Sequence, residues 1–262
     1  MRPKPRLFLA VAFIGALLTA LVLPSIAGAN NSWGGYHWAR TSNPFTLQLG
    51  NNTSGTWTAL LGTASSDWSQ SAVLDTSVVA GGTRPKVCRP TAGRVEVCNA
   101  SYGNTGWLGV AQIWISGGVH ITQGTVKNND YYFGTSTYQY NNEAEKLHVI
   151  CQEIGHTLGL DHQSTDGASL NTCMDYYHNT SNSDTLSTHP NQHDYDELAL
   201  IYAHQDSSTT VAASPARAGA AEQDASNEWG ELVGASRDGR SATYERDAGG
   251  GNKLVTFVIW TR

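Results

Sequence analysis

The alternation of apolar and polar residues predicts five strands and one helix in the first half of the chain. In residues 45–49 every second side chain is apolar, which is typical of a strand with one buried face. Similar apolar-rich runs predict strands at residues 73–79, 94–98, 108–115 and 121–127. Between the first two strands, apolar residues recur at helical spacing and predict a helix over residues 57–71: Trp57, Leu60, Leu61, Ala64 and Trp68.

A second helix is expected to begin near Glu143. Asn142 and Glu145 form an asparagine version of the capping box, in which each side chain binds the backbone N–H of the other residue. Apolar side chains then repeat every three or four positions and form one stripe that should pack on the sheet: Ala144, Leu147, Cys151, Ile154 and Leu158. Gln152 and His156 lie off this stripe, so the helix has a separate polar surface facing the expected cleft.

A third helix is expected over residues 194–204, with Asp194 as its cap. It completes a main domain that spans residues 30–205. Residues 206–226 are rich in Ser, Thr and Ala and have few large apolar side chains, which is typical of a flexible linker.

The C-terminal extension, residues 227–262, regains strand-like patterning. Strands at residues 240–246 and 253–260 are expected to pair as a β-hairpin. The extension is too short to form a secure core of its own, so we expect it to dock on the main domain or on a partner.

The N-terminus has the layout of a secretory signal peptide. Three basic residues precede an apolar run at 7–23, and Ala27-Gly28-Ala29 offers a cleavage site that would release residues 1–29. The alternative is an uncleaved membrane anchor, because the apolar run is long for a signal peptide. Removing the three basic residues takes the formal net charge from −6 to −9, and an acidic chain without a basic cluster argues against nucleic acid as a partner. We therefore expect a secreted protein without membrane contact after cleavage.

Candidate chemistry is concentrated in the segment CQEIGHTLGLDH. Gln152 and His156 are four positions apart and share one face of the helix, with Glu153 beside them. Gly159 can end the helix in a left-handed conformation, after which the chain can turn and bring His162 back toward His156. A glutamine, a glutamate and two histidines at these spacings suit one metal ion.

This segment resembles the zinc signature H-E-x-x-H-x-x-G-x-x-H of the metzincin metalloproteases, including the matrixin-like ones. Glu153, His156, Gly159 and His162 match the signature position for position, whereas Gln152 stands where the family has its first zinc-binding histidine. The resemblance implies an α/β (α+β) fold of the metzincin type. Such a fold has a five-stranded, mixed, twisted sheet, an active-site helix, a Met-turn and a C-terminal helix.

The resemblance also assigns roles outside the motif. Met174 follows His162 by twelve positions and corresponds to the Met-turn, whose thioether packs under the metal site; ordinary core packing is the alternative. Tyr176 is a candidate fifth ligand or transition-state stabiliser. The strand at residues 108–115 corresponds to the antiparallel edge strand that aligns an extended substrate, with an ordinary edge or core strand as the alternative.

Four cysteines indicate an oxidising compartment, in which three pairings are possible. We favour Cys88–Cys98, which closes a short loop, and Cys151–Cys173, which ties the metal helix to the loop beneath the metal. A bridge that closes a loop of about twenty residues contributes on the order of 3 kcal/mol.

The function implied by the resemblance is a Zn²⁺-dependent endopeptidase. Gln152, His156 and His162 would be the metal ligands, and Glu153 would be the general base for a metal-activated water. The amide oxygen of Gln152 is a weaker zinc donor than imidazole, which leaves three interpretations. Gln152 is a working third ligand, or Tyr176 or another group completes the ligand set, or the chain is a non-catalytic metzincin-fold binding protein with a metal-poor site.

Other residues make weaker candidates. His148 shares a face with Gln152 but lies about 12 Å along the helix axis from His156, too far for both to bind one zinc ion. Asp161 would serve only if His162 turned away. The other polar residues of this region are interpreted as structural, surface, turn or cap residues: Asp166, Asp175, His178, His189, His193 and His204.

Signatures of other chemistries are missing from the sequence. It has no G-x-S-x-G, no P-loop and no G-x-G-x-x-G after a strand, although an unrelated hydrolase stays open as an alternative. We expect a monomer that acts on a peptide or protein substrate.

Overall fold

The computed structural model describes residues 31–134, 137–139, 141–164, 166–212 and 228–261. Its helices are α1 (Thr56–Trp68), α2 (Asp130–Phe133), α3 (Glu143–Thr157) and α4 (Gln192–Ile201). Its strands are β1 (His37–Trp38), β2 (Phe45–Asn52), β3 (Leu74–Ala80), β4 (Val95–Ala100), β5 (Trp107–Ser116), β6 (His120–Asn129), β7 (Glu231–Ala235), β8 (Ser241–Gly249) and β9 (Asn252–Trp260).

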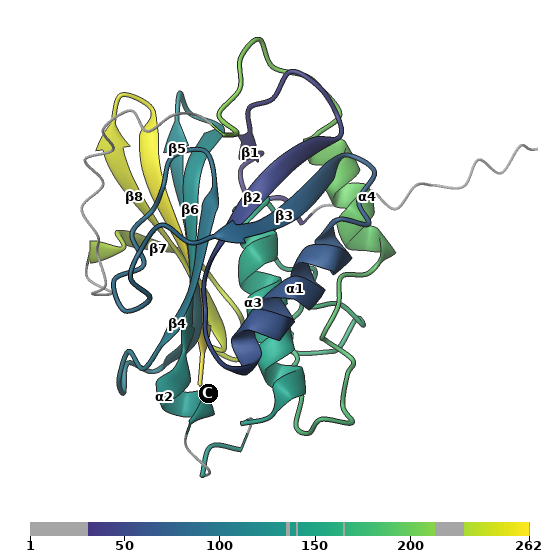
Figure 1. Cartoon of the computed structure of the whole chain (residues 1–262), viewed down its shortest axis with the longest axis vertical. Helices are drawn as coiled ribbons and strands as arrows, with labels where there is room; N and C mark the ends of the chain where they lie inside the picture. Colours follow the sequence, from purple (N-terminus) through teal and green to yellow (C-terminus); the bar gives the residue numbers. More distant parts are fainter. Residues whose placement is uncertain (1–30, 135–136, 140, 165, 213–227, 262) are drawn as a thin grey trace, which may run out of the picture.

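The described strands form one mixed sheet of nine, in the order β3-β2-β4-β6-β5-β9-β8-β7, with β1 pairing separately with β6. Strands β3, β2, β4 and β6 are mutually parallel. From β5 onward every pairing is antiparallel. Helices α1 and α3 lie on one side of the sheet (Figure 1). The sheet is strongly twisted, so that β2 and β3 run obliquely across the view while β5, β6 and β8 run nearly vertically (Figure 1). The expected mixed α/β class is therefore confirmed.

All five strands predicted in the first half of the chain are present, within a few residues of the expected bounds. The five-stranded sheet implied by the resemblance is nevertheless too small, because the sheet continues through β9, β8 and β7. The expectation that the strand at residues 108–115 lies at an edge is wrong. It is antiparallel to β6 as expected, but its other side pairs with β9 from Trp107 to Ile115.

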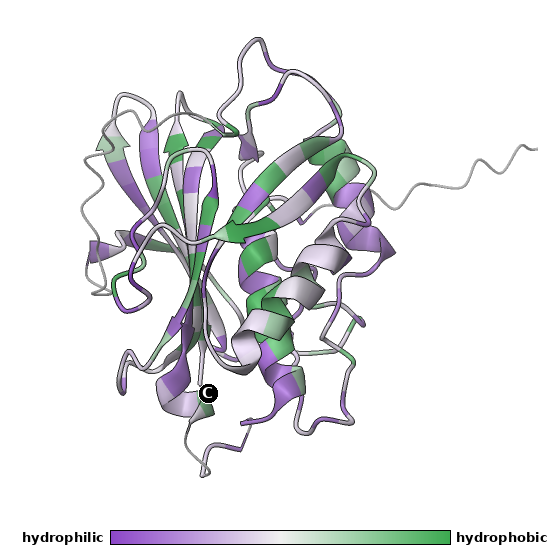
Figure 2. Cartoon of the chain, viewed as in Figure 1, coloured by the Kyte–Doolittle hydropathy of each residue, from purple (hydrophilic) through white to green (hydrophobic). Residues whose placement is uncertain are grey.

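Helix α3 follows its predicted pattern closely. The side chain of Asn142 accepts a hydrogen bond from the Glu145 backbone N–H, which caps the helix at the predicted place. Figure 2 shows the middle of α3 as hydrophobic where it faces the sheet and α1, and its first turn as hydrophilic. The indole of Trp68 in α1 donates to the carbonyl of Cys151, which fixes the two helices against each other.

Helix α4 begins two residues earlier than predicted, and its cap is Asn191 rather than Asp194. The Asn191 side chain accepts from the backbone of Asp194, and the Asp194 carboxylate accepts from the backbone of Asn191. Asp194 is therefore the third helical residue of a capping box. The prediction failed because an acidic residue can fill either position of this motif.

The C-terminal hairpin of β8 and β9 forms as predicted and docks on the main sheet through β9. Part of the predicted linker differs from expectation, because the backbones of Asp206, Thr210 and Ala212 donate hydrogen bonds to the main domain. Residues 213–226 of that linker and the predicted signal peptide at 1–29 lie outside the described residues. The proposed division of the chain into units stays a prediction.

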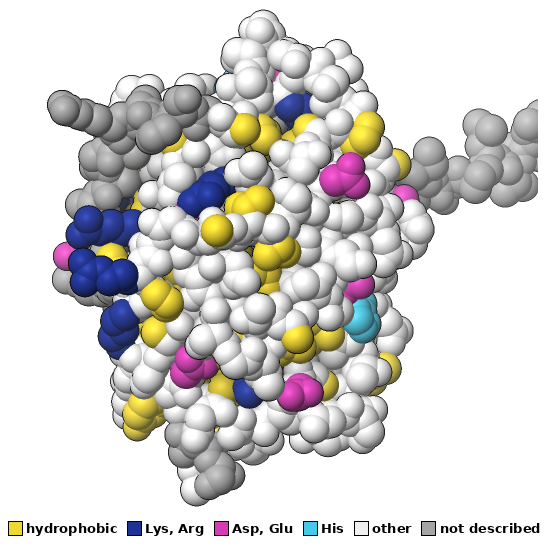
Figure 3. All heavy atoms as spheres, viewed as in Figure 1, with side chains coloured by type: hydrophobic (Ala, Val, Ile, Leu, Met, Phe, Trp, Pro, Cys, Tyr) yellow, Lys and Arg dark blue, Asp and Glu magenta, His cyan; other side chains and the backbone are white. Residues whose placement is uncertain are grey.

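Both favoured disulfides, Cys88–Cys98 and Cys151–Cys173, are present and fit an oxidising compartment. In the part of the chain that the structure describes, no helix has the length and apolar character needed to cross a membrane. On the face shown in Figure 3, hydrophobic side chains occur in small separate patches, and Lys and Arg side chains gather toward the side of the C-terminal strands.

Candidate metal centre

The loop that follows α3 is held beneath the helix. Cys173 is bonded to Cys151, and the neighbouring Met174 is fully buried. A Cβ atom at Gly155 would lie 2.4 Å from the Met174 Sδ, so a larger residue at this position would displace Met174. Met174 thus packs under α3 as expected, and its assignment as a Met-turn stays a prediction.

Gly159 ends the helix and redirects the chain. Its φ of +101° lies in the left-handed region, as predicted, and a Cβ there would lie 2.2 Å from the Tyr36 carbonyl oxygen. The turn brings His162 back to His156, with their Nε2 atoms 3.1 Å apart. The structure therefore brings together the two histidines that the motif pairs.

The other ring nitrogen of each histidine is engaged. His156 Nδ1 is 2.9 Å from the Leu160 carbonyl, which can only accept, so Nδ1 donates and Nε2 of the neutral ring has a free lone pair. Burial and the neighbouring His162 lower the pKa of His156 to about 3, so the ring is neutral at pH 7. His162 Nδ1 lies 3.1 Å from Asp161 Oδ1 and 2.9 Å from the Tyr176 hydroxyl.

Asp161 therefore orients His162 rather than replacing it. Burial alone would raise the pKa of Asp161, but the hydrogen bond and charge of His162 outweigh it and lower the pKa. Tyr176 stacks on the His162 ring, with centroids 4.1 Å apart, and its hydroxyl faces Nδ1 rather than the Nε2 that meets His156. The contact seen for Tyr176 is thus an orienting one.

Gln152 is fastened to the same loop. Its amide Nε2 donates to the carbonyls of Cys173 and Asp175 at 2.7 and 2.6 Å, which uses both N–H groups. Its Oε1 is then the one side-chain atom left for a metal ion. Among the described residues, no His, Cys, Asp or Glu forms a three-residue ligand group with His156 and His162.

Glu153 is fully buried between α3 and β5. Neither carboxylate oxygen has a hydrogen-bond partner among the described residues, and a Cβ at Gly109 would lie 2.6 Å from Oε1. Burial raises the pKa of Glu153 well above its usual value, and the Ala111 backbone, which does not meet hydrogen-bond geometry with either oxygen, lowers it only in part. An unpartnered buried carboxylate needs a functional explanation, because burying it costs stability.

His148 does not approach the histidine pair and belongs to a separate buried cluster. Its Nδ1 lies 3.3 Å from Glu145 Oε2, while His178 binds the other oxygen of Glu145. Burial would raise the pKa of Glu145, but the charges of His178 and His148 lower it to about 2. This cluster ties the first turn of α3 to the loop that carries Tyr176.

The C-terminal strands cover the histidine pair, and no pattern in the sequence predicts this contact. The Phe257 ring of β9 stacks on His156 with centroids 4.2 Å apart and planes 4° from parallel. From β8, Ser241 Oγ lies 3.4 Å from His162 Nε2. Arg240, just before β8, donates to the Tyr176 carbonyl. Phe257 and Ser241 come more than seventy positions after His162, and no local pattern links them to it.

The histidine pair fits a zinc ion in its spacing and donor chemistry. Two imidazoles on one tetrahedral zinc, each about 2.05 Å from the metal, place their nitrogens about 3.3 Å apart.

A scan against protein-family models finds no match to the chain, and a search of curated proteins finds no relative. The case for a metal site therefore rests on the geometry of the histidine pair. The Nε2 atoms of His156 and His162, 3.1 Å apart, are close enough to share one proton or to bind one cation.

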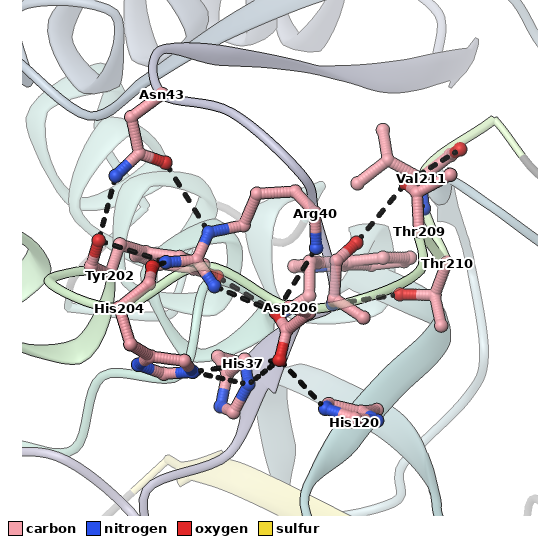
Figure 4. A network of polar contacts seen from close by, with 12 residues as sticks. His37, Arg40, Asn43, His120, Tyr202, His204, Asp206, Thr209, Thr210 and Val211 are labelled. Carbon is pink, nitrogen blue, oxygen red and sulfur yellow. Dashed lines mark hydrogen bonds and ion pairs between the residues drawn. The ribbon is translucent and has the colours of Figure 1, made fainter.

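A second group of metal-binding residues lies elsewhere in the fold. His37, His204 and Asp206 present ligand atoms within 4.8 Å of one another, and His120 contacts the same aspartate (Figure 4). The sequence predicts a structural or surface role for His204, which does not anticipate this group. The four residues are dispersed over the chain, so motif spacing could not find them.

Proposed function

We propose that the chain is a secreted zinc-dependent endopeptidase related to the metzincins. His156 Nε2, His162 Nε2 and the Oε1 of Gln152 would hold the metal, and Glu153 would act as the general base. The observation that carries the proposal is the convergence of His156 Nε2 and His162 Nε2 at 3.1 Å, in a fold whose helix α3 also carries a buried carboxylate without a hydrogen-bond partner among the described residues.

Zinc, when bound, supplies a Lewis acid that polarises the peptide carbonyl and makes a water molecule more acidic. Glu153 would take a proton from water and return it to the leaving amine. Its burial against β5 raises its pKa, which makes the Glu153 carboxylate a stronger proton acceptor. Asp161 and the Leu160 carbonyl hold the two rings in position through their Nδ1 atoms.

Substrate access depends on the C-terminal strands. A peptide that added to β5 by strand pairing would need the edge that β9 occupies, and it would need the space that Phe257 fills above His156. We infer that the described arrangement is a closed form and that β9 must move for cleavage.

A non-catalytic binding protein is the second candidate function. The commitment of the Gln152 amide nitrogen to two backbone carbonyls favours it, because a side chain held in this way serves the fold with or without a metal. The two candidates differ in whether Glu153 matters for turnover.

The test compares the wild-type chain with Glu153→Gln and Glu197→Gln. Glu197 is a matched control, since it is also buried, has a raised pKa and has one carboxylate oxygen without a partner. We expect zinc-dependent cleavage of unfolded protein substrates by wild type and Glu197→Gln, and a loss of at least 100-fold in Glu153→Gln with zinc retained. The binding protein would be established instead if all of these proteins bind zinc and none cleaves the substrate, even when Phe257→Ala removes the ring that covers His156. No zinc at His156 and His162 would refute both the enzyme and its metal site.

A further inference from the structure

Four polar side chains from distant segments meet at the end of the sheet where β1 pairs with β6. His37 comes from β1, His120 from the first residue of β6, and His204 and Asp206 from the segment that follows α4 (Figure 4). His37 Nε2 lies 3.1 Å from His204 Nε2 and 3.5 Å from Asp206 Oδ1. His204 Nε2 lies 3.7 Å from the same oxygen.

The hydrogen-bond partner of His37 determines which ring nitrogen carries the proton. Its Nδ1 is 2.8 Å from the Gly35 carbonyl, which can only accept. Nδ1 is therefore the donor, and Nε2 of the neutral ring directs a lone pair at His204 and Asp206. A carbonyl that fixes the tautomer of a histidine in this way is the usual outer partner of a metal ligand.

Asp206 is oriented by a second set of contacts. Its Oδ2 accepts from Arg40 Nη1 at 2.8 Å and from the Arg40 backbone N–H at 3.1 Å. Because Arg40 is buried and binds Oδ2, Oδ1 is left to face the imidazoles. His120 Nε2 lies 3.1 Å from Oδ1 and holds it from another side.

We propose that His37 Nε2, His204 Nε2 and Asp206 Oδ1 bind one Zn²⁺ ion, with His120 as the partner that positions Asp206. Two imidazole nitrogens and a carboxylate oxygen are donors that zinc favours. The three separations between ligand atoms, 3.1, 3.5 and 3.7 Å, bracket the roughly 3.3 Å expected around a tetrahedral zinc ion. The side chain of His204 is 51% exposed, which gives the ion a path from solvent and leaves a position for water.

The other group with metal-binding residue types, Glu145, His148 and His178, does not support the same proposal. Its carboxylate oxygens are each engaged by a histidine, and Glu145 Oε2 also accepts from the Asn179 backbone. His148 Nε2 faces the Asp175 carbonyl, so a proton on each of its nitrogens satisfies the ring without a metal ion.

A zinc ion at the His37 site would connect β1 to the segment that follows α4. His37 and His204 are 167 positions apart, and the same region carries the ion pair of the buried Arg40 with Asp206. Binding to the folded state alone shifts the unfolding equilibrium, so the site would stabilise the chain in proportion to zinc occupancy. This role is independent of peptide cleavage.

The test compares zinc content and thermal stability in the full chain, its His204→Ala variant and a matched control, His189→Ala. His189 pairs with Asp67 through a side chain that is 53% exposed, nearly the same as for His204, but it lies outside the cluster. After equilibration with Zn²⁺ and dialysis, we expect wild type and His189→Ala to retain one more zinc per chain than His204→Ala. Zinc should raise the thermal midpoint of the first two proteins by more than that of His204→Ala.

The His120→Ala variant measures the positioning role. Loss of an outer partner should weaken zinc binding about 10- to 100-fold while keeping the stoichiometry of wild type. Circular dichroism verifies that the variants stay folded. We expect His204→Ala to fold, because the His204 side chain is half exposed. Equal zinc content in wild type and His204→Ala would overturn the proposal, whatever happens at His156 and His162, because the comparison measures only the difference between the two proteins.

Discussion

At the scale of single residues, Gln152 decides how the motif is interpreted. A histidine at this position in the related motif would bind zinc, whereas the Gln152 amide also holds the loop by donating to two buried carbonyls. The sequence identified Gln152 as the departure from the motif. It could not identify the two carbonyls, since their position depends on how the Cys173 loop folds back under α3.

Replacing Gln152 by histidine should therefore have two opposite effects. Zinc affinity should rise at least 10-fold, because imidazole is the stronger donor and even indirect changes at metal sites have effects of this size. The metal-free protein should lose about 1–3 kcal/mol of unfolding free energy, because a ring nitrogen cannot donate to both carbonyls. Zinc titration and urea unfolding measure the two effects, and an unchanged zinc affinity would mean that position 152 does not face the metal.

Glu145 provides a pH-dependent prediction outside the proposed metal site. The pKa of Glu145 falls from 4.5 to about 2 in the folded state. Its ionised form therefore adds to the free energy of unfolding above pH 4.5, and this stabilisation is lost as the pH falls toward 2. The pKa of His148 is raised by Glu145 against the effect of burial, so that contribution is present below pH 6.5 and is lost as the pH rises through the folded value.

The Glu145→Gln variant should thus be destabilised most between pH 4.5 and 6.5, by about 3 kcal/mol, as expected when one partner of a buried ion pair is removed. Urea unfolding of wild type and variant at pH 3, 5.5 and 8 measures the difference. If the loss of unfolding free energy in Glu145→Gln is the same at all three pH values, Glu145 does not form the proposed ion pairs.

At the scale of elements, local patterns predicted which segments are helices and strands, and the structure confirms most of them. The capped start of α3 and the five early strands depend on neighbours within a few positions, which a sequence displays directly. The partner of β5 depends instead on a strand about 145 positions later, and strand-like patterning does not specify its partner. This is why the assignment of β5 as an edge strand failed.

The cover formed by β9 gives a prediction with an internal control. Phe257 and Val258 are both buried, but Phe257 stacks on His156 while Val258 packs with Trp107 and Trp229. Replacing either by alanine should loosen β9, at a cost of about 3–5 kcal/mol for the larger phenylalanine. Both variants should increase peptide cleavage, but Phe257→Ala by several-fold more than Val258→Ala, because only the loss of Phe257 also uncovers the His156 ring. Equal rates in the two variants would contradict a cover at this position.

At the scale of the whole molecule, the C-terminal extension belongs to the main sheet. The pairing of β5 with β9 places part of the extension where, under the proposed function, an extended substrate would pair, and β8 brings Ser241 to His162. The mixed α/β class could be predicted from the sequence, through the periodicity of its segments and the resemblance, and both disulfides could be predicted as the favoured choice among three possible pairings. The size of the sheet, the cover over the histidines and the His37 group could not, because each depends on contacts between segments that are distant in the chain.

The proposed function requires a zinc ion between His156 and His162. Anomalous diffraction at the zinc absorption edge, from crystals of the full chain grown with Zn²⁺, locates the metal directly. We expect a peak about 2 Å from both Nε2 atoms. A peak at His37 and His204 with none at His156 and His162 would show that zinc entered the crystal and did not bind there, and this result would contradict the account.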